Sequence, residues 1–201
     1  MHAHIHNEET NNTNTKSHYP NQRHFITREI GIDAGHRVTF HGSKCRNLHG
    51  HRYTIEATCV GPLFTEGEQQ GMVLDFGFLK EEMVRECDEP CDHGMILWID
   101  DPFTLKLALG GDSDILARVR EAVQLVGYHQ LRLNVDDNTG GKYYIVPFVP
   151  TAENLAKHWF ERLAARVTQR TDNQASLYSV KVYETPNCSA QYPTNPTNPT
   201  N

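Results

Sequence analysis

The chain of 201 residues has a net charge of −6 at neutral pH, from 19 Lys and Arg against 25 Asp and Glu. This acidic balance argues against a protein that binds nucleic acid through a broad basic surface, so we expect no nucleic-acid partner. The length fits one domain with its own core. No apolar run approaches the ~18 residues of a membrane span, so we expect no membrane association. Five cysteines, odd in number and not densely spaced, favour a reducing compartment, which predicts a cytoplasmic protein.

The two ends of the chain differ in composition from its middle. Residues 1–22 are polar and rich in Asn, Thr and His, and residues 193–201 repeat Pro-Thr-Asn. Such segments bury too little apolar surface to offset the entropy lost on ordering, so both are predicted to be disordered tails. We therefore expect a single domain over residues 23–192.

Two strands with alternating apolar residues open the predicted domain. The first runs roughly from His24 to His36 and has its even positions mostly apolar; the second follows a His-Gly-His motif and has apolar odd positions to Cys59. His36 continues the apolar face of the first strand, and His49 and His51 share that of the second. The two strands therefore present three histidines from consistent faces.

Two helices are predicted from apolar residues at helical spacing. The first begins at Asp75, whose side chain can cap it, and ends at Pro90. The second begins at Thr151, directly after a proline. Their predicted core stripes are Phe76, Leu79, Met83 and Cys87 in the first helix, and Leu155, Trp159, Leu163 and Val167 in the second.

Further strands are predicted from Leu177 to Glu184, with Tyr178 on the same side as Glu184, and near residues 190–192. Residues 99–148 form an inserted segment, with a helix capped near Asp112 and then a hairpin. Without this insertion the order of elements is ββααββ. The sequence thus predicts an α+β fold in which two helices lie on one face of a four-stranded antiparallel sheet.

The strongest chemical signal is Cys45-x3-His49-Gly50-His51 together with His36. Zinc binds imidazole nitrogen, and three histidine ligands leave a fourth position open for water or substrate, as in catalytic sites. A single strand histidine is usually an ordinary polar residue, but the joint pattern argues for a metal. From the spacing alone, Cys45 is either a fourth ligand or a thiolate beside the metal.

A second cluster is Cys91-Asp92-His93 at the end of the first predicted helix. An adjacent aspartate fixes the tautomer of a histidine and raises its basicity, which suits a proton relay. Spacing alone favours the simpler interpretation, a surface pair at a helix end. Cys87 and Cys91 have no second Cys or His pair nearby to complete a zinc site, so we interpret them as ordinary helix cysteines.

These motifs together resemble the 6-pyruvoyl- and 6-carboxy-tetrahydropterin synthase family. Its members are tunnelling-fold (T-fold) enzymes that act on 7,8-dihydroneopterin triphosphate. The similar segments cover about residues 34–98 and 149–192 and occur in the family's order. They are Ala34-Gly35-His36-Arg37, Cys45-x3-His49-Gly50-His51, Met72-Val73-Leu74-Asp75-Phe76, Asp92-His93, Pro150-Thr151-Ala152-Glu153-Asn154 and Val182-Tyr183-Glu184-Thr185.

The resemblance implies a role for each matching residue. It implies that His36, His49 and His51 bind zinc, that Cys45 is the catalytic cysteine, and that Asp92 and His93 form a proton-relay pair. It also implies that Glu184 anchors the aminopyrimidine edge of a pterin, and that Thr151 and Glu153 lie at a helix start near the same pocket. A helix cap is a sufficient alternative role for Thr151.

The short spacing from Cys45 to the His-Gly-His motif resembles the bacterial enzymes that make 6-carboxytetrahydropterin and release acetaldehyde on the way to queuosine-type 7-deazaguanines. We therefore expect this lyase activity. The 6-pyruvoyl reaction on the same substrate is one alternative, and a non-catalytic pterin- or purine-binding protein with structural zinc is another. The resemblance also implies a homo-oligomer with active sites at subunit interfaces. The insertion at residues 99–148 departs from compact members of the family.

Overall fold

The computed structural model describes residues 22–133 and 141–193. The predicted tails, residues 1–22 and 193–201, lie almost wholly outside the described residues. The turn of the predicted hairpin, residues 134–140, also lies outside them. No described helix is long and apolar enough to cross a membrane.

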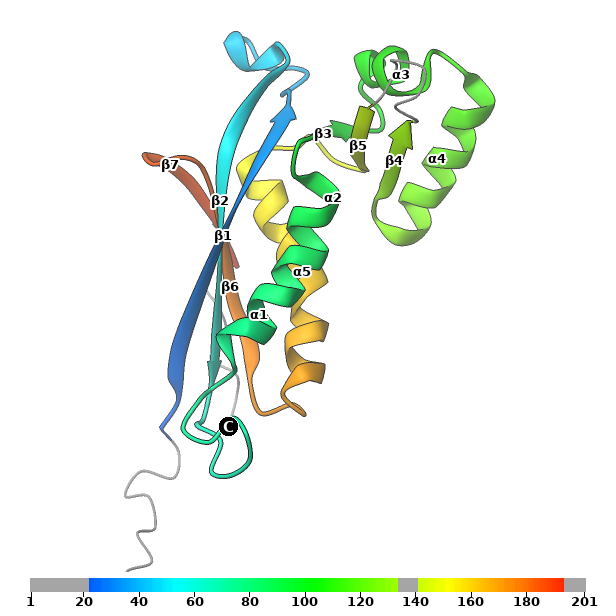
Figure 1. Ribbon diagram of the computed structural model, residues 1–201. Helices are drawn as coiled ribbons and strands as arrows, with labels where there is room; N and C mark the ends of the chain where they lie inside the picture. Colours follow the sequence, from blue (N-terminus) through cyan, green and yellow to red (C-terminus); the bar gives the residue numbers. More distant parts are fainter. Residues whose placement is uncertain (1–21, 134–140, 194–201) are drawn as a thin grey trace, which may run out of the picture.

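The strands form one mixed sheet in the order β4-β5-β3-β1-β2-β6-β7 (Figure 1). The strands are β1 (His24–His36), β2 (His49–Gly61), β3 (Gly94–Trp98), β4 (His129–Leu133), β5 (Gly141–Val146), β6 (Ser176–Thr185) and β7 (Cys188–Tyr192). The helices are η1 (Lys44–Arg46), α1 (Phe76–Met83), η2 (Val84–Asp88), α2 (Glu89–Cys91), α3 (Pro102–Leu109), α4 (Ser113–Val126) and α5 (Ala152–Arg170).

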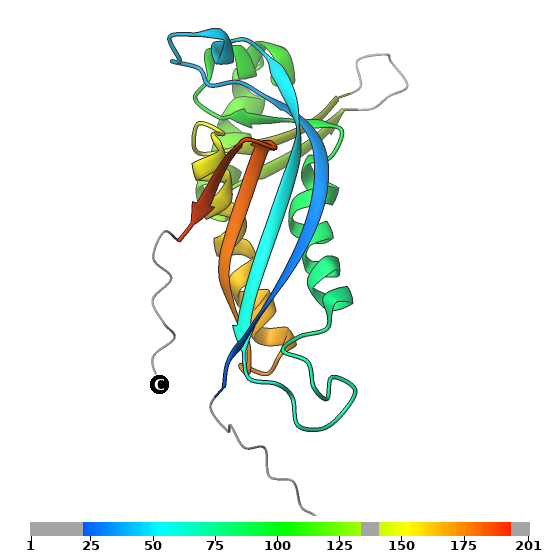
Figure 2. The same ribbon diagram turned by 90° about the vertical axis from the view of Figure 1, so that its left-hand side faces the viewer.

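The predicted α+β core is confirmed in β1, β2, β6 and β7. Each of these strands pairs antiparallel with its neighbour. The segment from α1 to α2 and the long helix α5 cover one face of this part of the sheet, as the two views in Figures 1 and 2 show. The other face of the four strands carries no helix in these views.

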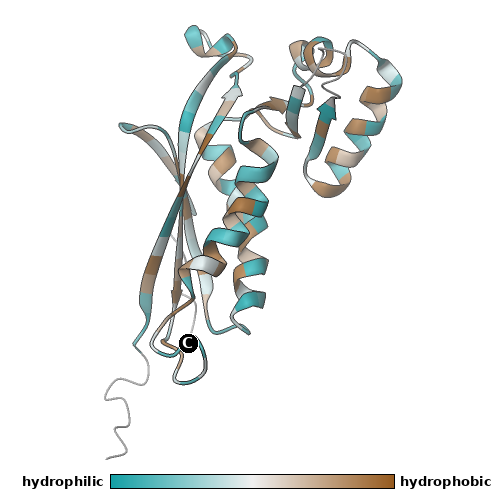
Figure 3. Ribbon diagram, viewed as in Figure 1, coloured by the Kyte–Doolittle hydropathy of each residue, from teal (hydrophilic) through white to brown (hydrophobic). Residues whose placement is uncertain are grey.

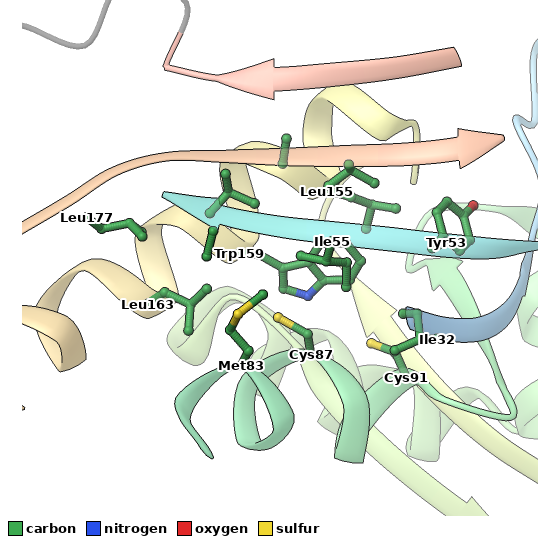
Figure 4. Packing of buried hydrophobic residues seen from close by; sticks show 14 of the residues in the cluster. Ile32, Tyr53, Ile55, Met83, Cys87, Cys91, Leu155, Trp159, Leu163 and Leu177 are labelled. Carbon is green, nitrogen blue, oxygen red and sulfur yellow. The ribbon is translucent and has the colours of Figure 1, made fainter. Parts of the chain in front are cut away.

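The core lies between these helices and the sheet. Figure 4 shows Trp159 of α5 against Met83 and Cys87 of the helical segment and Ile55 of β2. All four side chains are fully buried. The predicted stripe of α5 is confirmed because Leu155, Trp159, Leu163 and Val167 are all buried, and Cys87 and Cys91 are core residues with free thiols, as expected.

The first helical segment differs from its prediction at both ends. Pro90 does not end it, because α2 continues to Cys91. The π-helical turn η2 interrupts the regular series of helical hydrogen bonds just before Pro90. Pro90, which has no N–H to donate, therefore lies at the start of a new helical turn, where proline is tolerated. Phe76 was predicted to face the core but is 51 % exposed; it lies in the first turn of α1, and the buried residues of that helix begin at Leu79.

A bulge in β6 changes the predicted faces of that strand. Leu177 pairs with Cys59 and Ser179 pairs with Thr58, so Tyr178 is the extra residue. The alternation therefore shifts at this point: Leu177 is buried, while Tyr178 stacks edge-on against the exposed ring of Phe25. The prediction that Tyr178 shares the side of Glu184 was wrong because it assumed an uninterrupted strand.

The insertion extends the sheet, which the sequence did not reveal. The predicted helix is α4, capped by Asp112, and the predicted hairpin is the antiparallel pair β4–β5. The strand β3 and the helix α3 were missed. β3 joins the core sheet through parallel pairing with β1 at Ala34 and Gly35. A second apolar cluster fills the space under α3 and α4, and hydrophobic residues alternate with hydrophilic ones along α4 (Figure 3).

Candidate metal centre and active site

Strand pairing brings three histidines together. His36 at the end of β1 lies directly opposite His49 at the start of β2, and Ala34 lies opposite His51. Because side chains alternate along a strand, His49 and His51 project from the same face of β2. One nitrogen from each of the three rings lies within 4.8 Å of the others. Within the described residues, these three histidines form the group that could hold a metal ion.

Hydrogen bonds to carbonyl oxygens fix the tautomers of two of these rings. His36 Nδ1 lies 2.7 Å from the carbonyl oxygen of Pro150, and His49 Nδ1 lies 2.8 Å from that of Asn47. A carbonyl oxygen only accepts, so Nδ1 carries the proton in both rings and Nε2 keeps its lone pair. The buried His36 Nε2 has no hydrogen-bond partner in the described structure. This pattern is typical of metal-binding histidines, whose second nitrogen is held by the protein.

Burial favours the neutral form of two of the rings, His36 and His51. It lowers the pKa of His36 to about 4; the bond to Pro150 acts in the opposite direction, and the neighbouring His49 and His51 lower the pKa further. Burial also lowers the pKa of His51, opposed by the charge of Glu184. A neutral imidazole is the form that binds a metal ion, so these residues are ready to bind one near neutral pH.

Two further side chains border the histidines. Glu184, near the end of β6, has Oε1 3.9 Å from His36 Nε2. The ring of Tyr53 lies 5.4 Å from that of His51 and 5.8 Å from that of His36, and closes the site on the core side. Tyr53 was not singled out from the sequence, although it continues the parity of His49 and His51.

Cys45 lies in the short helix η1, on the loop that connects β1 to β2. Its side chain is half-buried, and its carbonyl oxygen accepts a hydrogen bond of 2.9 Å from the N–H of Val38. Cys45 does not belong to the group of nitrogen ligands formed by the histidines. In the described structure Cys45 is therefore not a fourth ligand of this group.

Asp92 and His93 form a hydrogen-bonded pair at the edge of β1. Asp92 Oδ2 lies 2.6 Å from His93 Nδ1, and its Oδ1 accepts from the N–H of Asp33 at 2.8 Å. The N–H of His93 donates to the carbonyl of Asp33 at 2.7 Å. These bonds hold His93 in the left-handed region at φ 54°, a conformation that costs about 1 kcal/mol or more in a residue other than glycine.

The hydrogen bonds of this pair favour the charged form of Asp92, and they leave the His93 ring exposed to solvent. Burial acts to raise the pKa of Asp92, yet the hydrogen bonds from Asp33 and His93 outweigh it and keep that pKa below its ordinary value. The His93 side chain is 79 % exposed. Among the described residues, no hydrogen bond or ion pair links Asp92 or His93 to the three histidines. The sequence thus predicted a pair that forms, but within one chain it stands apart from the metal group.

The two helix-start residues have plainer surroundings. The Thr151 hydroxyl caps α5 by accepting from the N–H of Asn154, and Glu153 is exposed in the first turn. The contribution of this corner to the site is the carbonyl of Pro150, which holds His36. Sequence reasoning missed it because any residue supplies a carbonyl.

Comparison with known proteins decides the family. The family model for 6-pyruvoyl tetrahydropterin synthase matches residues 25–195. The chain belongs to this family. A 6-carboxy-5,6,7,8-tetrahydropterin synthase of Rickettsia conorii is 32 % identical over 81 % of this chain and 94 % of its own length. The enzyme of the same name from Haemophilus influenzae is 29 % identical over 83 % of this chain and 96 % of its own.

Solved structures support the T-fold of the family. An uncharacterized protein of Wolinella succinogenes superposes with a TM-score of 0.62 at 23 % identity, over 85 % of this chain and 97 % of that one. The 6-pyruvoyl tetrahydropterin synthase of Plasmodium vivax gives a TM-score of 0.53 at 19 % identity, over 85 % and 96 % of the two chains. At these identities the likeness establishes the fold, which agrees with the α+β architecture expected from the sequence.

Proposed function

We propose that the protein is a zinc-dependent 6-carboxy-5,6,7,8-tetrahydropterin synthase. This lyase converts 7,8-dihydroneopterin triphosphate to 6-carboxytetrahydropterin and releases triphosphate and acetaldehyde. The observation that carries the proposal is the group of three histidine side chains whose ring nitrogens lie within 4.8 Å of one another, with Glu184 beside His36. The names of the Rickettsia and Haemophilus relatives favour the 6-carboxy over the 6-pyruvoyl product.

The residues present fit a zinc ion. His36, His49 and His51 would hold it, because three imidazole nitrogen donors suit zinc and leave a coordination position for substrate. When bound, the metal supplies Lewis-acid stabilisation to the hydroxyl oxygens of the substrate side chain. Glu184 accepts hydrogen bonds from the 2-amino and ring N–H groups of the pterin, a pairing that a carboxylate can make in bidentate fashion.

Two proton-transfer groups complete the proposal. Cys45 acts as the base that takes a proton from the substrate side chain. His93 moves a second proton as triphosphate leaves, and Asp92 orients its ring by accepting the Nδ1 proton. Thr151 caps the helix beside the pocket, and Glu153 lies on the same turn near the substrate.

The separation of the relay pair from the metal group supports an interfacial site. His93 is exposed beside Asp33 of β1, whereas His36 of the histidine group is buried and bonded to the carbonyl of Pro150. A second copy of the chain would bring its relay pair to the metal group of the first, so we propose a homo-oligomer with active sites between subunits. The cytoplasmic location, the link to 7-deazaguanine synthesis and the domain limits at residues 23–192 remain predictions.

Product identification tests the function. The pure zinc-loaded protein is incubated with 7,8-dihydroneopterin triphosphate, and products are identified by mass spectrometry with a parallel assay for acetaldehyde. We expect 6-carboxytetrahydropterin and acetaldehyde in equal amounts. A 6-pyruvoyl product without acetaldehyde would assign the alternative reaction, and binding of the pterin without turnover would assign a non-catalytic protein. Full turnover in Cys45→Ala would contradict the assigned base.

A further inference from the structure

A buried carboxylate links the insertion to the loop that carries Cys45. Asp101, the N-cap of α3, is only 2 % exposed. Its Oδ1 accepts from the N–H of Phe103 at 2.8 Å, as an ordinary cap does. Its Oδ2 instead lies 2.8 Å from both the Thr39 hydroxyl and Arg37 Nε. Both oxygens of Asp101 are therefore engaged, one by the insertion and one by the loop.

The contrast with Asp112 shows that capping alone does not explain this arrangement. Asp112 caps α4 through one oxygen, which accepts from the N–H groups of Asp114 and Ile115, and it is exposed. A buried carboxylate is costly unless it is paired and hydrogen-bonded, so Asp101 must be satisfied by partners that the insertion does not provide. The loop between β1 and β2 provides them.

The two loop residues that Asp101 holds flank the anchor of Cys45. Val38 lies between Arg37 and Thr39, and its N–H donates to the carbonyl of Cys45. Fixing the side chains on both sides of Val38 fixes the direction of that N–H, and with it the backbone of the turn that presents the thiol. The loop and α3 lie at the same end of the molecule in Figure 1.

Aromatic contacts strengthen the same junction. The Arg37 guanidinium lies over the ring of Phe103, 5.3 Å from its centroid, and Phe40 meets Trp98 edge-on at 5.7 Å. The end of β3 and the start of α3 therefore contact the loop at several points, and the Asp101 carboxylate is the charged group among them.

We propose that Asp101 is a positioning residue for the reaction, through which the insertion fixes the loop that carries Cys45. The inference rests on the proposed function in so far as Cys45 is the base. A thiol displaced by about 1 Å loses proton-transfer geometry without losing substrate affinity, so Asp101 acts mainly on kcat.

The test compares Asp101→Asn with Asp112→Asn. Asparagine caps helices about as well as aspartate, so both variants keep their caps, and only Asp101→Asn puts an N–H₂ group or a neutral oxygen against Arg37 and Thr39. Thr39→Val, which removes only the hydroxyl, is the milder second variant. For each protein we measure zinc content, kcat, KM and backbone hydrogen exchange of residues 37–48.

For Asp101→Asn we expect exchange in residues 37–48 to be at least about ten-fold faster, kcat to fall on the order of 10- to 100-fold, KM to change less than about three-fold, and zinc content to stay unchanged. Thr39→Val should show the same pattern more weakly, and Asp112→Asn should match the wild type. Wild-type exchange in Asp101→Asn would overturn the proposal, as would a kcat loss that follows a loss of zinc, which would place the effect at His36.

The exchange measurement needs no turnover. If the wild-type protein makes no product but Asp101→Asn still loosens residues 37–48, the proposed function fails while the structural link stands.

Discussion

His36 and Pro150 are joined by a hydrogen bond between Nδ1 and the carbonyl oxygen, 2.7 Å long, across 114 positions of sequence. This bond ties the end of β1 to Pro150, the residue before the N-cap of α5, and it leaves Nε2 of His36 free to face His49 and His51. The metal group is therefore oriented by the packing of a helix onto the sheet, and it depends on the fold as a whole.

The first prediction concerns metal binding. Replacing His51 with alanine removes one of three nitrogen donors, so bound zinc should fall from about one ion per chain to about a tenth of that or less after dialysis. Inductively coupled plasma mass spectrometry measures this. The matched control is His41→Ala, which removes an exposed histidine outside the group and should keep its zinc. Full occupancy in His51→Ala would contradict the assignment.

The second prediction concerns the relay pair. Asp92→Asn keeps an oxygen for the N–H of Asp33 but loses the charge that orients the imidazole of His93, so kcat should fall about 10²- to 10⁴-fold with zinc retained. Steady-state kinetics and metal analysis give both readouts. Asp88→Asn, a change of the same chemistry one helical turn earlier, should leave kcat within about two-fold. Equal losses in the two variants would show that the effect is not specific to the pair.

The third prediction tests sites shared between chains. Cys45→Ala and His93→Ala should each be inactive, but mixed oligomers assembled from both should recover activity at interfaces that combine two intact contributions. Random mixing in a symmetric assembly restores about a quarter of the sites. The measurement is activity after co-expression in equal amounts, with each variant alone as control. No recovery despite proven mixing would place the whole site within one chain.

The fourth prediction is a pH dependence of stability. His158 is buried with Nε2 2.7 Å from the Tyr144 hydroxyl, and burial, aided by the charge of Arg162, lowers its pKa to about 3. Below its unfolded pKa of about 6.5 the unfolded chain binds a proton that the folded chain does not, so stability is complete above pH 6.5 and is lost progressively toward pH 3.

His158 alone should lower the free energy of unfolding by about 1.6 kcal/mol between pH 6.5 and pH 5. His158→Gln keeps an acceptor for Tyr144 and does not titrate, so its free energy of unfolding should fall less over this interval. Urea denaturation of both proteins at both pH values measures how much free energy of unfolding each loses. Subtracting one loss from the other removes the contribution of the other titrating groups, which the two proteins share. Identical losses in the two proteins would show that folding does not lower the pKa of His158.

The fifth prediction concerns the core. Leu163 of α5 is fully buried, so Leu163→Ala should lower the free energy of unfolding by about 2–5 kcal/mol through lost apolar burial and a cavity. Leu125→Ala is the matched control, because Leu125 is 84 % exposed and its change should stay within about 0.5 kcal/mol. Denaturation curves that shift by the same amount would contradict this picture of the core.

Local patterns predicted the core of this fold well. Alternation along β1 and β2 indicated their faces, and Asp75 and Thr151 cap the helices expected to start there. The structure departs from the prediction at two places where the regular geometry of a helix or strand is interrupted. The π-helical turn η2 carries the helix through Pro90, and the bulge at Tyr178 shifts the faces of β6. Neither leaves a mark in hydrophobic spacing, because each depends on contacts with other parts of the chain.

The candidate site was predictable where chemistry lies in side chains. His36, His49 and His51 were brought together by strand parity alone. What could not be predicted are the groups behind the site. The carbonyl of Pro150, which holds His36, has no sequence signature, and Asp101, which holds Arg37 and Thr39, was not singled out because helix α3 was missed. Strand β3 was missed because its few apolar residues pair in parallel with a segment far away in sequence.

The bonds between Asp33 and the Asp92–His93 turn have a consequence for how far another strand can extend along β1. Asp33 gives both its backbone N–H and its carbonyl to this turn. On this side of β1, the described strands leave only the stretch from His24 to Ile32 without a partner, roughly 30 Å at ~3.3 Å per residue. A strand added there, from another chain or a designed peptide, must stop at Asp33. The turn that carries His93 thus also sets the length of any strand that pairs with this edge of β1.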